Sequence, residues 1–185
     1  MSPEPPSLTI SKRLRLLIGT QPSPEQYAFA LEQLGSRRSG SESLAARALA
    51  SWGRTEDRRA IKAWFEERWP AHGSCFRPDL IEIFRRFTDP TDVAWLVDRF
   101  VGGTTGLRTS LSFVLREQPD AHRIAADLVA RADAQLTIDT IHGLMWSRGR
   151  YGRILQHLAS SDQLGIRQEA ERRLALFSRF PDRYR

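Results

Sequence analysis

The chain has 185 residues, of which 41% are hydrophobic and 27% are charged. This balance predicts one soluble globular domain, and it excludes both a disordered chain and a membrane protein, because no stretch approaches the roughly 18 apolar residues that span a bilayer. The net charge of +6 is carried almost entirely by arginine, since only Lys12 and Lys62 of the 28 basic residues are lysines.

The single cysteine, Cys75, rules out a disulfide framework within the chain and a four-cysteine zinc site. The first residues contain Glu4 and three prolines where a secretion signal would carry positive charge, so we expect the mature protein to start here and to stay in the cytoplasm. An arginine-rich surface suits carboxylate and phosphate partners. A GC-rich genome produces the same arginine bias on any surface, and both explanations stay open.

Apolar residues recur at spacings of three and four along nearly the whole chain, while alternation with period two is almost absent. This pattern predicts an all-α protein of about ten amphipathic helices joined by short polar turns. The expected helices cover residues 7–18, 23–35, 41–52, 55–69, 78–87, 90–101, 105–117, 121–132, 134–146 and 151–159, and Asp162 opens a last one. Loops this short predict that successive helices pack antiparallel, as a compact bundle or as a row of helix hairpins.

Two helix starts carry especially clear signals. Ser23 and Gln26 have the spacing of a capping box, with Pro24 in the first turn. Asp89 stands at the N-cap of helix 90–101, and two glycines follow the last apolar residue of that helix. On the same helical reasoning, Trp52 and Phe84 are expected to lie in the core.

A self-comparison favours the row of hairpins. Residues 63–69 recur 31 positions later as 94–100, and a weaker third copy follows at 125–131. Fixed-period similarity of this kind is typical of solenoids. We therefore expect hairpins that stack along one direction.

The segments 45–69, 81–100 and 162–180 resemble the HEAT-like repeat family, in the short bacterial form found in phycobilisome-lyase-type repeats. The resemblance implies an α-solenoid of about five antiparallel helix pairs, with the second helix of each pair lining a concave side that holds another macromolecule. It implies a domain over 23–180, preceded by an N-terminal segment at 1–22 and followed by a short tail at 181–185.

The outward residues of the second helices are therefore the candidates for contact with a protein partner. Trp95 is the expected anchor, because it lies opposite the apolar stripe of its own helix and because aromatic side chains dominate binding energy. A structural alternative is that Trp95 packs between repeats. The complete set is Lys62, Glu66, Trp95, Arg99, Arg123, Asp127, Arg153 and Gln156.

The stretch 147–153 reads SRGRYGR and is expected to form the turn between two helices, directly after Trp146. Arg148, Arg150 and Arg153 would neutralise an anion there, the glycines would let backbone amides approach it, and Tyr151 would offer a ring for stacking a base. A structural alternative is that Gly149 caps a helix and that Tyr151 points into the core.

The sequence contains no phosphate-binding loop, dinucleotide fingerprint, zincin motif or nucleophile elbow. His72 and Cys75 form one H-x-x-C pair without a second pair, and the other histidines, His122, His142 and His157, are dispersed. We therefore expect no enzyme, cofactor or metal site.

The resemblance implies a protein-binding module, either an adaptor or an immunity protein that neutralises a toxin. The alternative function is binding of the nucleic-acid backbone. A less favoured form of this alternative is a HEAT-like DNA glycosylase. The pair Trp95 and Asp98 superficially resembles the tryptophan and carboxylate that those enzymes use.

Overall fold

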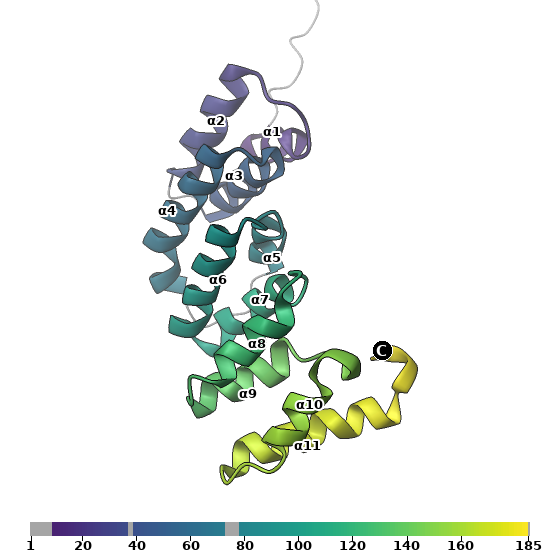
Figure 1. Cartoon of the computed structure of the whole chain (residues 1–185). Coiled ribbons are helices and arrows are strands. Elements are labelled where there is room, and N and C mark those ends of the chain that lie inside the picture. Colours follow the sequence, from purple (N-terminus) through teal and green to yellow (C-terminus); the bar gives the residue numbers. More distant parts are fainter. Residues whose placement is uncertain (1–8, 37–38, 73–77, 185) are drawn as a thin grey trace, which may run out of the picture. The chain divides into compact units, whose positions relative to one another are not determined.

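A computed structural model describes residues 9–36, 39–72 and 78–184. In these ranges the chain forms eleven α-helices and one short 3-10 helix, and it contains no strand, so the expected all-α class is confirmed (Figure 1). Helices α1 to α5 form one compact unit, and the remaining helices form a second. The sequence pattern predicts a single domain and not this division, and the expected solenoid stays a prediction.

The first unit is organised around α3. Its helices are α1 (Ile10–Leu17), α2 (Pro24–Leu34), α3 (Ser39–Trp52), α4 (Thr55–His72) and α5 (Pro78–Phe84). Helix α3 packs against each of the other four. It can do so because Ala45, Ala46, Ala48 and Ala50 are small and buried around most of its circumference.

Three aromatic rings fill the core of the first unit. Phe84 is fully buried, and its ring meets the rings of Phe65 and Phe87 edge to face, with centroids 5.3 and 5.1 Å apart. This arrangement is favourable for aromatic quadrupoles. The expected core position of Phe84 is confirmed, whereas Trp52 is only half-buried and donates its indole N–H to the Leu17 carbonyl over 3.2 Å.

The capping box of α2 is confirmed, because the Ser23 hydroxyl accepts from the Gln26 amide and the Gln26 side chain accepts from the Ser23 amide. Two other expected boundaries are wrong. Helix α3 begins at Ser39, which leaves Ser41 buried inside it and not at its cap. Helix α4 continues through Pro70 to His72, since a proline near a helix end removes a single backbone hydrogen bond.

The second unit contains α6 (Pro90–Gly102), α7 (Thr105–Leu115), α8 (Ala121–Val129), α9 (Ala134–Gly143), α10 (Arg148–Leu158), α11 (Leu164–Arg179) and the 3-10 helix η1 (Pro181–Arg183). Helix α9 packs against α7, α8 and α11, and α10 lies along α11. The expected N-cap of α6 is confirmed, because the Asp89 carboxylate accepts from the Thr91 amide over 3.0 Å.

A buried ion pair connects three helices of the second unit. Arg108 on α7 donates to the Asp139 carboxylate on α9 over 2.9 Å. The same guanidinium donates to the carbonyls of Phe100 and Val101 in the last turn of α6. Arg108 therefore links α6, α7 and α9, while the Asp139 carboxylate also accepts from the Thr105 hydroxyl and the Gln135 side chain.

Helix α9 ends at Gly143, three residues before its expected end at Trp146. At this point α7 approaches so closely that a Cβ atom on Gly143 would lie 2.5 Å from the Cβ of Ser112. Only glycine permits this approach. Helix α9 thus packs closely against α7 at its last residue.

The internal repeat matches the pattern of burial only in part. An offset of 31 residues carries the buried Phe65 of α4 onto the buried Leu96 of α6. The same offset carries Leu96 onto Asp127 of α8, whose side chain is exposed. The third copy is thus shifted by about one residue relative to the buried face of α8, and on a helix of 3.6 residues per turn such a shift moves a side chain off that face.

Candidate functional site

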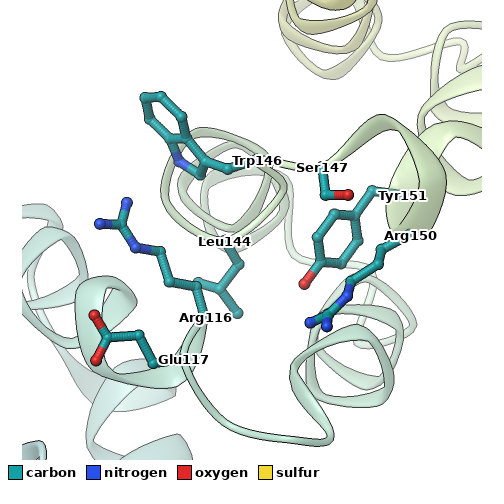
Figure 2. A pocket seen from close by; sticks show the side chains of 7 residues that line it. All are labelled: Arg116, Glu117, Leu144, Trp146, Ser147, Arg150 and Tyr151. Atoms are coloured by element: carbon teal, nitrogen blue, oxygen red, sulfur yellow. The ribbon is translucent and has the colours of Figure 1, made fainter. Parts of the chain in front are cut away.

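A hollow of about 330 Å³ opens on the second unit where α7 and α9 end and α10 begins. Figure 2 shows its lining. We call it the Trp146 hollow, and it is lined by Arg116, Glu117, Leu144, Trp146, Ser147, Arg150 and Tyr151. It therefore combines two cations, one carboxylate, two hydroxyl groups and an apolar floor.

Trp146 is 37% exposed, and no other tryptophan with a described side chain is exposed to this degree. Its indole N–H donates to the His142 carbonyl over 2.9 Å, which fixes the ring at the end of α9. On the protein side the ring meets Tyr184, with centroids 6.1 Å apart. An ordered but exposed indole loses little conformational entropy when a partner covers it.

A buried arginine supports the inner face of this indole. Arg173 on α11 is 3% exposed, and its guanidinium carbon lies 4.4 Å from the centre of the Trp146 ring. Its Nη2 donates to the His142 carbonyl over 2.9 Å, while its Nε and Nη1 have no hydrogen-bond acceptor among the described residues. Burial lowers the pKa of Arg173. The charge is balanced by the ring face and by the negative end of α9.

Arg116 forms the opposite side of the Trp146 hollow and caps the end of α7. Its guanidinium carbon lies 4.1 Å from the ring centre of Phe113 and 5.8 Å from that of Trp146. Stacking on aromatic rings holds a guanidinium by its faces, whereas its N–H donors lie in its plane. The orientation of Arg116 is therefore set before any ligand arrives.

The first turn and a half of α10 forms the remaining side. Tyr151 is 2% exposed, and burial raises the pKa of its hydroxyl above its ordinary value. Arg150 is exposed, and Figure 2 shows its guanidinium beside the Tyr151 hydroxyl. Ser147 stands at the N-cap position of α10, although its side chain makes no capping hydrogen bond.

The prediction that residues 147–153 form a turn is therefore wrong. Arg148 is the first residue of α10, so Gly149 lies inside a helix and is no C-cap. Helix α10 starts early because Tyr151, Leu155 and Leu158 form its buried face and because the Arg148 amide donates to the Tyr184 carbonyl over 2.8 Å. The buried ring of Tyr151 has no face to offer a base, so its expected stacking role is wrong too.

The arginines of this stretch do reach the surface. Arg148, Arg150 and Arg153 are all exposed on α10. No acidic residue occurs between Asp139 and Asp162 in the sequence. The surface of α10 beside the Trp146 hollow is consequently cationic.

The side chains expected to contact a partner lie on four helices. Lys62 and Glu66 belong to α4 of the first unit, and the other six belong to α6, α8 and α10 of the second. Trp95 is half-buried, and the guanidinium carbon of Arg99 lies 5.8 Å from its ring centre. Arg123 and Asp127 are widely exposed and 4.0 Å apart, and Arg153 and Gln156 are exposed. Their alignment along one groove stays a prediction.

Sequence reasoning singled out Trp146, Arg150 and Tyr151 but missed Arg116, Glu117 and Leu144. Arg116 directly follows the buried stripe of α7, where an arginine is ordinary at a helix end. Nothing in the local sequence pairs it with residues some thirty positions later. Only the packing of α7 against α9 brings it beside Trp146.

Among the described residues, no three His, Cys, Asp or Glu side chains gather where they would hold a metal ion. Cys75 of the H-x-x-C pair lies outside the described ranges. Within those ranges, every helix is too short or too polar to cross a membrane.

No protein-family model and no curated protein sequence matches the chain. Among solved structures, the chain is similar to an engineered protein whose crystal structure was determined by the Northeast Structural Genomics Consortium, with 14% identity, a TM-score of 0.38 and coverage of 92% of this chain and 96% of that one. A similarity this low carries no functional argument.

Proposed function

We propose that this chain is a non-enzymatic protein-binding module, an adaptor or toxin-neutralising protein, that contacts its partner through the Trp146 hollow. The observation that carries the proposal is an exposed, prepositioned indole beside Arg116, in a hollow that Arg150 and Tyr151 also line. Tryptophan, tyrosine and arginine are the residue types that dominate the energy of protein interfaces. The resemblance to HEAT-like repeats supports the same class of function, and the single cysteine fits action in the cytoplasm.

The rigidity of the Trp146 hollow adds to this argument. Arg173 and Tyr184 hold the indole from behind, and Phe113 holds Arg116. A surface that is already ordered in this way loses little conformational entropy on binding. It is therefore suited to an anchor that enters a complementary pocket or cleft of a folded partner.

A photo-crosslinking experiment tests the proposal. A benzophenone amino acid at position 146 is expected to capture a specific protein in the native host. With that purified protein, Trp146→Ala is expected to weaken binding by about 2 kcal/mol or more, because a central aromatic anchor is lost. Isothermal titration calorimetry measures the change.

Leu164 is the matched control, since it is a large apolar residue, 57% exposed, at the start of α11 and outside the hollow. The same probe at position 164 is expected to capture nothing, and Leu164→Ala to leave the affinity unchanged. Capture at position 95 and none at 146 would instead place the anchor at Trp95, as the sequence predicts. Equal yields at 146 and 164 would contradict the proposal.

Nucleic-acid binding is the second candidate function, favoured by the three exposed arginines of α10. If Arg148, Arg150 and Arg153 each contact one phosphate, a plot of log affinity against log salt concentration is expected to have a slope of about −2 to −3, with similar affinity for unrelated sequences. Mobility-shift titrations at two salt concentrations measure it. No binding at the lower concentration would eliminate this function and glycosylase activity with it.

A further inference from the structure

We propose that the Trp146 hollow recognises an acidic segment of the partner, whose carboxylates pair with Arg116 and Arg150 and in which a neighbouring apolar side chain covers Trp146. The inference rests on the proposed function and specifies the chemistry of the partner. Figure 2 shows the two guanidinium groups on either side of Leu144 and Tyr151. They come from separate helices, α7 and α10.

The first argument concerns charge. The Trp146 hollow has two arginines against one carboxylate, and Arg148 and Arg153 extend the positive surface along α10. The positive end of the α10 dipole lies at the same place, since the helix begins at Arg148. An anionic group is attracted to such a place, and a planar carboxylate matches the fork of an arginine.

The second argument concerns hydrogen bonds. Tyr151 lines the hollow, and its phenolic hydroxyl is a donor to a carboxylate oxygen. Glu117, in contrast, is an acceptor in the same lining. A peptide supplies both an anionic side chain for the arginines and backbone N–H donors for Glu117, whereas a phosphate backbone has no donor for Glu117.

The third argument concerns the apolar surface. Leu144 is buried in the floor, and the exposed face of Trp146 rises beside it. A partner residue that covers this face loses contact with water and excludes water from the ion pairs, which strengthens these pairs. The surface thus selects acidic residues interspersed with apolar ones over a uniformly charged chain.

Fluorescence anisotropy with purified protein tests this chemistry. The probes are a labelled peptide of alternating glutamate and leucine, a lysine and leucine peptide of equal length, and a labelled single-stranded oligothymidine. We expect the acidic peptide to bind most tightly and its affinity to fall as salt is added. Arg150→Ala is expected to weaken the binding of the acidic peptide about tenfold. Arg150→Lys is expected to weaken it by less, because lysine keeps the positive charge but lacks the forked guanidinium donors.

The control variant is Arg131→Ala, which removes one exposed arginine of the second unit away from the hollow and is expected to change the affinity by less than about twofold. Because Arg150 is exposed, its variants are expected to melt like the parent. Equal affinity for the two peptides, or equal effects of Arg131→Ala and Arg150→Ala, would overturn the inference. Tighter binding of the oligothymidine would assign the cationic surface to nucleic acid.

The two proposals fail in different ways. Suppose that a partner is captured at position 146 and that its binding is weakened by Trp146→Ala and not by Arg150→Ala. In that case the proposed binding surface is supported, and the proposed recognition of an acidic segment is wrong. If the acidic peptide binds with the expected dependence on Arg150, the chemistry is supported whether or not the host partner is captured.

Discussion

Arg108→Ala is expected to lower the free energy of unfolding of the second unit by about 3 to 5 kcal/mol. The guanidinium and the Asp139 carboxylate are 12% and 8% exposed, and Nη1 and Oδ2 lie 2.9 Å apart. Truncation leaves a buried carboxylate without its counter-ion. It also removes the donors to the Phe100 and Val101 carbonyls, which lie at the negative end of α6.

Urea unfolding followed by circular dichroism measures this loss. Arg131→Ala is the matched control, with an expected change within about 0.5 kcal/mol, because that arginine is exposed. The double variant Arg108→Ala/Asp139→Ala is expected to be more stable than the sum of the single variants predicts, since no unpaired charge remains. Additive effects, or an Arg108→Ala variant as stable as Arg131→Ala, would show that the ion pair does not hold the helices together.

Phe84→Ala is expected to destabilise the first unit by about 3 to 5 kcal/mol. The ring is fully buried between Phe65 and Phe87, and the core cannot close over the volume that a benzyl group leaves. A loss of this size is close to a third or more of the stability of an ordinary domain.

Thermal melting compares Phe84→Ala with Phe180→Ala, in which a 42% exposed ring is removed. The control is expected to change stability by less than about 1 kcal/mol, because much of its surface stays in contact with water in the folded state. If the two variants melt at the same temperature, the aromatic cluster is not the core of its unit.

Local signals in the sequence predict two helix starts correctly. The capping box at Ser23 and Gln26 and the N-cap at Asp89 are confirmed because each needs only residues within one helical turn. Helix ends were predicted less well. Gly143 ends α9 where Ser112 of α7 passes it, and this approach depends on a residue about thirty positions away.

The candidate site shows the same division between local and distant causes. The arginines of 147–153 stand out in the sequence, but their helix depends on a hydrogen bond from Arg148 to Tyr184 and on the buried face that includes Tyr151. Glycine propensity alone predicts a turn there. Arg116 and Arg173 reach Trp146 from α7 and α11, and no spacing within one helix indicates such a meeting.

The packing of Tyr184 against Trp146 has a consequence for how the protein is made. Tyr184 and Arg173 support the indole from behind and follow it in the chain, so the ribosome synthesises them after the rest of the hollow. Translation from position 146 to 184 takes about 2 to 8 s at roughly 5 to 20 residues per second. During that interval the nascent chain carries Trp146 without the Arg173 and Tyr184 side chains that support its ring.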